Sequence, residues 1–331
     1  MKLTSVVAVL SALASATATP TPTRERAATE PHKATVSDKA TLGYATQNGG
    51  TSGGAGGTVT TVSTLAQFTA AVALNNTAPA IVVVQGIING TAKVRVSSNK
   101  TIIGLPGSGF NGVGLLFLKQ KNLIIRNIVS SNVSASYGDG LTIQESTNVW
   151  VDHSEFHSAL VSNKNYYDGL IDVTHGSDFV TISHTHFHDH WKTSLVGHSD
   201  SNGAQDKGHL RVTYANNYWS NCNSRGPSVR FGTAHIYNSL YVNMSSAVNT
   251  RMGAQVLVES NVFKNVTSPI TSVDSTQVGY ATANGNDLGG KRNVAPYGNL
   301  TVASVSYNYT LLGAENVTAV VASEAGPILV F

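Results

Sequence analysis

The sequence Val151-Asp-His-Ser154-Glu-Phe156 recurs 31 residues later as Ile182-Ser-His-Thr185-His-Phe187. In both stretches an apolar residue is followed three positions later by a small polar residue, and two positions after that by a second apolar residue. Four more segments share this pattern: Ile124..Asn127..Val129, Tyr214..Asn217..Trp219, Ile236..Ser239..Tyr241 and Val258..Asn261..Phe263. The six central polar residues are 27, 31, 32, 22 and 22 residues apart, so the chain contains a structural repeat.

Each copy predicts a strand of alternating apolar residues, a tight bend at the polar residue and a second short strand. One copy cannot bury its apolar face alone, but stacked copies form a continuous core that encloses a ladder of hydrogen-bonded polar side chains. The fold class that we predict is therefore all-β, a single-stranded parallel β-helix. A β-sandwich is the alternative, but it requires hairpin turns where this chain has long and uneven connections.

The N-terminal end of such a stack has to be capped. Thr64-Leu-Ala-Gln67 resembles a capping box before the run 65–74. We predict a short capping helix there.

The chain begins with the features of a secretory signal peptide over residues 1–18. Lys2 supplies the positive charge, 6–13 the apolar stretch, and Ala16-Thr-Ala18 a small-residue cleavage site. Residues 19–38, rich in Thr, Pro and charge, are expected to form a linker or pro-segment, followed by one β-helix domain over 39–331. No later segment is apolar enough to span a bilayer, so we expect a secreted, extracellular protein with no membrane partner.

Composition narrows the possible partners. Only 12% of the residues are charged and the net charge is +3, so a nucleic-acid surface is not predicted. A single cysteine, Cys222, excludes an internal disulfide, so stability must come from the stacked core. We expect a monomer, glycosylated at some of nine acceptor triplets, which start at Asn75, Asn89, Asn99, Asn132, Asn243, Asn265, Asn299, Asn308 and Asn316.

Three aspartates occupy equivalent parts of two consecutive repeats. Asp139 lies 12 residues before Val151, while Asp168 and Asp172 lie 14 and 10 residues before Ile182. Stacking would place them on one face, about one strand spacing, roughly 5 Å, apart in height. Clustered carboxylates suit Ca²⁺, and solvated aspartates on turns are the other interpretation.

Three cations follow in the next repeats. Arg225 and Arg230 lie 11 and six residues before Ile236, and Lys192 lies in the intervening repeat. Cations and a metal on one wall would both engage the carboxylates of an acidic sugar polymer. Salt bridges on the surface of the stack are the alternative.

The alternating histidines His184, His186, His188 and His190 look like a metal-binding strand. The repeat, however, places a bend near Thr185, so the four rings cannot share one face. Surface or hydrogen-bonding roles are therefore expected instead of a zinc site.

Four segments together resemble the pectate lyases of polysaccharide lyase family 1: Trp150-Val-Asp-His153, Asp168-Gly-Leu-Ile-Asp172-Val, His190-Trp-Lys192 and Asn223-Ser-Arg225-Gly-Pro227-Ser-Val-Arg230. The resemblance runs from about residue 43 to 266 and is closest to the secreted fungal branch. It implies a right-handed β-helix. It also implies that Asp139, Asp168 and Asp172 bind Ca²⁺, that Arg225 is the catalytic base, that Lys192 and Arg230 bind substrate carboxylates, and that Trp150-Val-Asp-His153 is structural.

The activity implied by the resemblance is β-elimination on α-1,4-linked polygalacturonate, a plant cell-wall polysaccharide, which leaves a 4,5-unsaturated end. Arginine is an unusual base because its guanidinium holds its proton tightly, and neighbouring cations would have to disfavour that charge. Two positions depart from the family pattern. Tyr137 stands where many relatives carry another acidic residue, and Thr174 where some have lysine.

Three other functions remain open. A pectin lyase would act on methyl-esterified polymer without calcium, but would lack the aspartate cluster and line its cleft with aromatic residues. A glycoside hydrolase would use two of the aspartates as acid and base. A carbohydrate-binding protein without activity would need neither Arg225 nor Lys192 for turnover.

Overall fold

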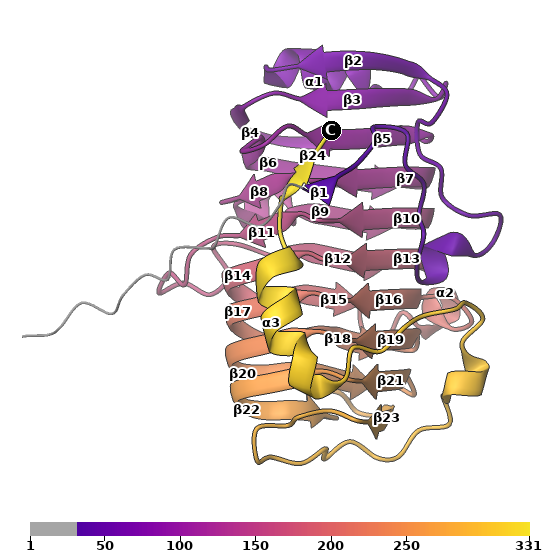
Figure 1. Cartoon of the computed structure of the whole chain (residues 1–331), viewed down its shortest axis with the longest axis vertical. Helices are drawn as coiled ribbons and strands as arrows, with labels where there is room; N and C mark the ends of the chain where they lie inside the picture. Colours follow the sequence, from indigo (N-terminus) through magenta and orange to yellow (C-terminus); the bar gives the residue numbers. More distant parts are fainter. Residues whose placement is uncertain (1–31) are drawn as a thin grey trace, which may run out of the picture. The chain divides into compact units, whose positions relative to one another are not determined.

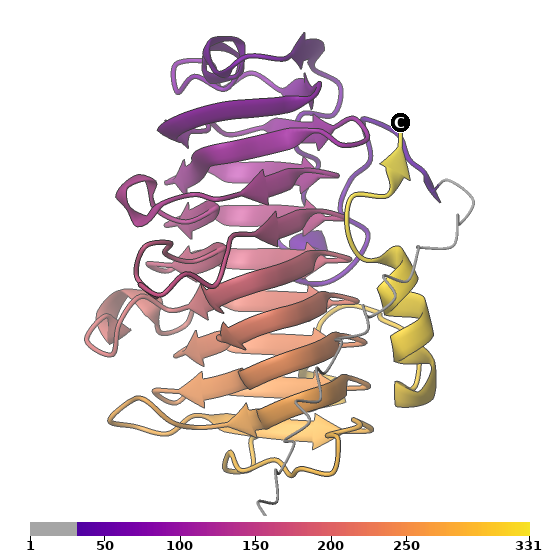
Figure 2. The same ribbon diagram turned by 90° about the vertical axis from the view of Figure 1, so that its left-hand side faces the viewer.

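The structure is a computed structural model that describes residues 32–331, which form a parallel β-helix (Figures 1 and 2). The expected signal peptide at 1–18 and most of the expected linker lie outside the described residues. The fold predicted from the repeat is confirmed, because the strands of the two large sheets pair in parallel with those one turn above or below.

One sheet of ten strands forms the first face of the helix. Its strands, in spatial order, are β2 (Thr58–Val62), β3 (Ala80–Val84), β5 (Lys100–Gly104), β7 (Lys121–Arg126), β10 (Thr147–Asp152), β13 (Asp178–Ser183), β16 (Arg211–Ala215), β19 (Thr233–Tyr237), β21 (Gln255–Glu259) and β23 (Tyr280–Asn284).

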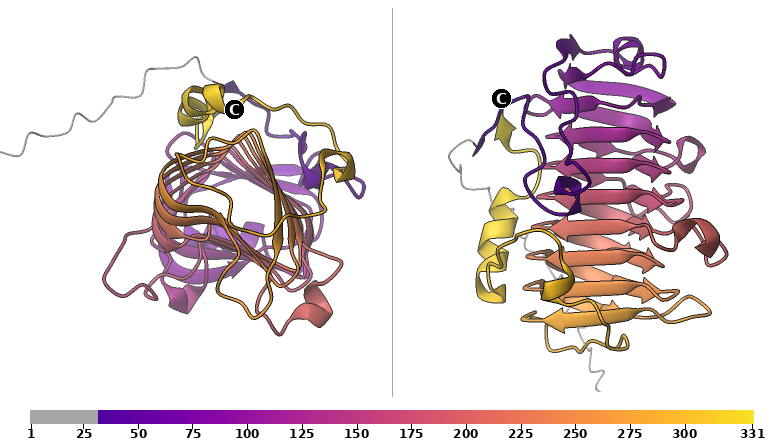
Figure 3. Two further views of the ribbon diagram at one scale, coloured as in Figure 1. Left: turned by 90° about the horizontal axis from the view of Figure 1, so that it is seen from below. Right: turned by 90° about the vertical axis from the view of Figure 1, so that its right-hand side faces the viewer.

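A second sheet folds round the other sides of the stack (Figure 3). The long strands β6 and β20 each pair with one set of short strands near their start and with another set near their end. The strands of the sheet are β4 (Ile87–Arg95), β6 (Gly109–Leu118), β8 (Val129–Ser131), β9 (Leu141–Gln144), β11 (Glu155–His157), β12 (Ile171–Thr174), β14 (His186–Lys192), β15 (Ser194–Val196), β17 (Tyr218–Ser224), β18 (Ser228–Arg230), β20 (Leu240–Arg251) and β22 (Val262–Thr271).

The predicted bends and polar ladder are present. Asn217 Oδ1 accepts from the Thr185 amide at 2.9 Å, and Asn261 Oδ1 accepts from the Ser239 amide at 2.8 Å, both fully buried. One detail of the repeat was wrong. Asp152 pairs with Arg126, so Ile128, and not Asn127, lies beside Ser154, and the first copy is one residue out of register. The aliphatic part of the Arg126 side chain allows this residue to be buried within a run of apolar residues. The alternating pattern there is therefore compatible with two registers that differ by one residue.

Aromatic residues at the last position of the repeat stack through the core. The rings of Phe187 and Trp219 have centroids 4.2 Å apart, and those of Tyr241 and Phe263 4.5 Å apart. Each ring is fully buried, and such stacked pairs contribute about 0.5–1.5 kcal/mol beyond the area that they bury. With Cys222 buried as a free thiol, this core takes the place of disulfides.

Short elements close the stack and cover one side. The predicted capping helix is α1 (Leu65–Ala71), and Thr64 accepts from the Gln67 amide at its N-terminus, although the helix ends before residue 74. The other short elements are η1 (Tyr44–Thr46), η2 (Ala135–Tyr137), α2 (Gly203–Asp206) and η3 (Val302–Ser304). None of the helices in residues 32–331 has the length and apolar character needed to cross a membrane.

The C-terminal segment ties the first described residues into the fold. Helix α3 (Ala314–Glu324) runs along the outside of the stack (Figure 2), packing Val317 and Val321 against Leu240 and Val262. After it, β24 (Leu329–Val330) pairs with β1 (His32–Lys33). Residues His32 and Lys33 are therefore tied to the C-terminal end of the chain by strand pairing.

Candidate active site

The predicted aspartates meet on neighbouring turns, where the chain enters β9 and β12. Asp139 lies just before β9 and Asp168 just before β12, while Asp172 is inside β12 beside Thr142 of β9. The parallel stacking of two repeats thus brings together residues about 30 positions apart, as the repeat spacing predicts.

Two of the carboxylates converge on Gly169. A β-carbon at this position would lie 2.4 Å from Asp172 Oδ1 and 2.8 Å from Asp139 Oδ1, so only glycine leaves room for them. Asp139 accepts from the Gly169 amide at 2.9 Å and from Thr142 Oγ1 at 2.6 Å. Asp172 accepts from the Leu195 amide at 3.0 Å. Few donors therefore neutralise the pair.

The pKa values of both carboxyls are raised, because the two groups are buried and lie near other carboxylates. Burial, together with the nearby Asp168, raises the pKa of Asp139. Burial and the Asp139 carboxylate raise the pKa of Asp172 well above its usual value, with Arg225 only partly offsetting them. Two buried carboxyls that resist ionisation side by side fit a divalent cation bound by oxygen ligands.

Asp168 is more exposed than the other two. Its Oδ1 accepts from Lys192 Nζ at 3.0 Å, and its side chain is 48% exposed. The oxygen atoms of the three carboxylates are therefore farther apart than the ligand atoms of two histidine-containing groups in residues 32–331, which lie within 4.8 Å of one another. These groups are Asp152 with His153 and His184, and Glu155 with His157 and His188. Like charges repel, and the Asp168 carboxylate pairs with Lys192. All three aspartates supply the hard oxygen ligands that calcium prefers.

A cleft carrying positive charge lies next to the aspartates. Its wall includes Lys192, Arg225, Lys164 and Arg251, and Trp191 is its one aromatic residue. Arg225, between β17 and β18, makes no side-chain hydrogen bond or ion pair with any residue of the described chain. Its guanidinium is thus available to a ligand in the cleft.

Arg230 is partly engaged by neighbouring residues. Its Nε donates to Asp200 Oδ1 at 2.6 Å and its Nη1 to the Gly197 carbonyl at 3.3 Å. Asp200 is in turn fixed by Ser275 Oγ at 2.7 Å. Arg230 therefore adds charge beside the cleft with part of its guanidinium already occupied.

The sequence of the chain matches the model of the pectate lyase family over residues 10–328. Pectate lyase A of Aspergillus niger is 52% identical over 305 residues, which cover 92% of each chain. Pectate lyase B of Colletotrichum gloeosporioides is 51% identical over 301 residues, 90% of this chain and 89% of that one. The chain belongs to the pectate lyase family. Among solved structures, the pectate lyase of Bacillus sp. N165 in complex with trigalacturonate superposes with a TM-score of 0.79 at 31% identity, covering 87% and 98% of the two chains.

Sequence reasoning missed two members of this pectate lyase site. Arg251 pairs with Arg230 across β18 and β20, and its burial, with Arg230 and Arg225 nearby, lowers its pKa to about 10. Lys93 is exposed, yet its Nζ lies 2.9 Å from where a β-carbon of Gly138 would be, next to Asp139. Arg251 follows Arg230 by 21 residues, close to the final repeat spacing of 22, which is a signal that could have found it.

His190 is a third missed residue, and it positions the site. It is buried, and its Nε2 donates to the Asp168 carbonyl at 2.6 Å while Nδ1 accepts from Ser158 Oγ at 2.6 Å. Burial and the nearby Lys192 and Arg225 lower its pKa to about 4, so it is neutral. The prediction that the four alternating histidines do not share a face is confirmed, since His190 points inward while His186 and His188 lie on the outer face of β14.

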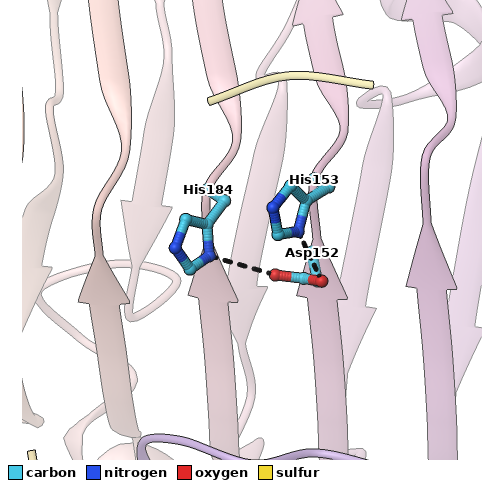
Figure 4. A group of neighbouring side chains, drawn as sticks. All are labelled: Asp152, His153 and His184. Atoms are coloured by element: carbon cyan, nitrogen blue, oxygen red, sulfur yellow. Dashed lines mark hydrogen bonds and ion pairs between the residues drawn. The ribbon is translucent and has the colours of Figure 1, made fainter. Parts of the chain in front are cut away.

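The Trp150-Val-Asp-His153 signature lies away from the cleft, at the bend after β10. Asp152 accepts from Arg126 Nε at 3.0 Å and from Ser183 Oγ at 2.7 Å. Its oxygens also contact Nδ1 of His153 at 2.7 Å and of His184 at 3.3 Å (Figure 4). Asp152 thus links three consecutive turns, which supports a structural role for this segment.

Proposed function

We propose that this protein is a secreted, monomeric enzyme that cleaves pectate, α-1,4-linked polygalacturonate, by calcium-dependent β-elimination and releases 4,5-unsaturated oligogalacturonides. One observation carries the proposal: a buried, under-neutralised carboxylate pair lies beside a cleft lined with cations. A divalent cation would neutralise the carboxylate pair, and the carboxylates of a polyuronate chain would pair with the cations of the cleft. The names of the relatives and the trigalacturonate bound to the Bacillus enzyme support the same substrate.

Asp139, Asp168 and Asp172 would hold the calcium. Carboxylate oxygens suit this ion, two of the three aspartates are buried, and Gly169 leaves room for both of these. When bound, calcium supplies positive charge that withdraws electrons from a substrate carboxylate and makes the proton on the adjacent C5 more acidic.

Arg225, in its neutral form, would take the C5 proton. The electron pair of the C5–H bond then forms the C4–C5 double bond, the C4–O4 bond breaks, and the leaving O4 takes up a proton from water. The Arg225 side chain is free of side-chain partners in the described chain and faces the cleft. His190, the other nitrogen base close by, has both ring nitrogens engaged and cannot take the proton. Lys192, Arg230 and Arg251 would hold the substrate carboxylates and stabilise negative charge as it develops.

The pectin lyase alternative is disfavoured by the complete aspartate cluster and by a cleft with Trp191 as its only aromatic residue. A hydrolase finds some support in the raised pKa of Asp172, since a hydrolase requires a protonated carboxyl as its acid. The hydrolase would make no double bond.

The deciding experiment follows the ultraviolet absorbance of unsaturated product from polygalacturonate, with calcium and with a chelator. Product that requires calcium is expected. Reducing ends without absorbance would establish hydrolysis, and equal activity on methyl-esterified polymer in chelator would establish a pectin lyase. No product in any condition would refute the lyase.

A further inference from the structure

A second group of potential metal ligands lies outside the cleft, on the outer face of β11 and β14. Glu155 and His157 alternate with the buried Phe156 on β11 and therefore point outward together. His188 lies on β14 directly beside His157, because the two strands pair in parallel at these residues. The stacking of turns therefore brings a carboxylate and two imidazoles to one point.

The spacing of these atoms fits a small metal ion. Glu155 Oε1 is 3.4 Å from His188 Nε2 and 3.7 Å from His157 Nε2, and the three ligand atoms lie within 4.8 Å of one another. Metal–ligand bonds of about 2.0–2.1 Å in a tetrahedral zinc site place ligand atoms roughly 3.4 Å apart. Two of the three separations are thus already close to that value.

A carboxylate behind the group orients one of the rings. Nδ1 of His188 contacts Asp189 Oδ2 at 2.8 Å, which leaves Nε2 facing Glu155. Asn221 holds the other oxygen of Asp189. A carboxylate on the far nitrogen of a histidine is the usual support of a zinc ligand, because it fixes the tautomer and the ring orientation.

The surroundings allow a cation to enter. Side chains of Glu155, His157 and His188 are 27%, 25% and 20% exposed, and in the described chain the ion pairs of Glu155 involve histidines alone.

The group at Asp152 has the same composition but is closed to metal. There Arg126 and Ser183 already donate to the two carboxylate oxygens, and the fixed guanidinium repels a cation. Glu155 has no such partner in the described residues. Of the two histidine–carboxylate groups, the geometry therefore favours the one on the outer face.

We propose that Glu155, His157 and His188 form a zinc site, separate from the calcium site, in which a water fills the fourth position. Two imidazoles and one carboxylate suit zinc, whereas calcium requires oxygen ligands. The ion would fasten β11 to β14, the strands that lead to Asp168 and Lys192, and would stabilise this part of the stack.

The test is titration of the full chain with zinc chloride at neutral pH, in excess calcium so that the aspartates are occupied. We expect one zinc per chain and a higher melting temperature. His157→Gln and His188→Gln should each weaken binding at least about tenfold, and Asp189→Asn about 10- to 100-fold. His198→Gln is the matched control, because it removes one ring of another histidine pair, whose centroid lies 4.2 Å from that of His175.

Melting curves without zinc establish that each variant is folded, and calcium-dependent cleavage should be unchanged in all of them. Glu155→Gln replaces any variant that fails to fold. Anomalous diffraction at the zinc edge from wild-type crystals should give a peak between the three side chains. The proposal is overturned by the absence of bound zinc, by an anomalous peak elsewhere, or by binding that survives both histidine substitutions.

Discussion

Asp172 and Asp152 are both buried carboxylates, yet their surroundings push their pKa values in opposite directions. Burial raises both. At Asp152 it is outweighed by His153 and His184, and the pKa falls well below its usual value. Asp172 has one backbone donor and the Asp139 carboxylate beside it, and its pKa rises. Asp152 is thus satisfied by the fold itself, whereas Asp172 is left to be satisfied by a ligand.

The difference shows how one scaffold separates stability from function. Each turn of the helix can supply donors to a carboxylate from the turns above and below. At the bend after β10 it supplies Arg126, Ser183 and two histidines, and at β12 it supplies a second carboxylate. A buried charge of the first kind is expected to hold turns together, and one of the second kind to bind a cation.

The largest effect should come from the cleft. Arg225→Lys keeps the positive charge but loses the shape of the guanidinium, and we expect the rate of unsaturated-product formation to fall about 10²- to 10⁴-fold, the usual contribution of a base. The melting temperature should not change, since the side chain makes no hydrogen bond within the described chain. Near-normal rates would refute the role of Arg225.

Asp152→Asn should act on stability instead. Breaking a buried ion pair costs about 3–5 kcal/mol, and Arg126 would keep only Asp38, which its Nη1 contacts at 2.9 Å. Denaturant unfolding measures this loss, and the folded fraction should retain its calcium-dependent activity. The structural assignment would be contradicted if Asp152→Asn lost as much activity as Asp172→Asn while its free energy of unfolding stayed unchanged.

The same aspartate makes a pH prediction. Because the folded pKa of Asp152 is depressed, its stabilisation is present above the unfolded value of about 3.9 and is lost as the pH falls through the folded pKa. Wild-type unfolding free energy should therefore decline with acidification below roughly pH 5. Asp152→Asn should show a shallower decline over the same range.

Asp172→Asn should reverse the pattern. The raised pKa means that ionised Asp172 costs free energy in the folded protein, a cost that appears as the pH rises through the folded pKa. In chelator at alkaline pH the variant should be at least as stable as wild type, while calcium no longer raises its melting temperature. Activity should fall roughly 10²-fold or more, because metal charge contributes several kcal/mol. A destabilised variant in chelator would show that Asp172 resembles Asp152 after all.

The smallest effect is expected at Lys93. This exposed cation lies next to Asp139 and opposes the binding of calcium. Lys93→Ala should lower the calcium concentration for half-maximal activity by up to about fivefold, the scale of an exposed charge pair. Lys119→Ala, with a side chain 69% exposed and paired with Glu145, is the matched control.

Much of this molecule could be predicted without coordinates. The period of the repeat requires stacked strands, since no copy can bury its apolar residues alone, and the bends require buried polar residues. The same spacing places Asp139 beside Asp172, because equivalent positions of stacked turns are neighbours. The register of the first copy escaped this reasoning, because alternating patterns of period 2 tolerate a shift of one residue.

Only the tertiary structure decided how each charge is used. The sequence contains Asp152, Asp172 and Glu155 as similar acids near histidines or other acids. Partners from neighbouring turns lie 23 to 33 residues away, and small differences in side-chain direction determine which donors arrive. Arg126 closes Asp152, the Asp139 carboxylate lies beside Asp172, and Glu155 faces two imidazoles. Repeats determine which residues can be neighbours, but packing of the particular side chains determines which of them bind one another and which remain for a ligand.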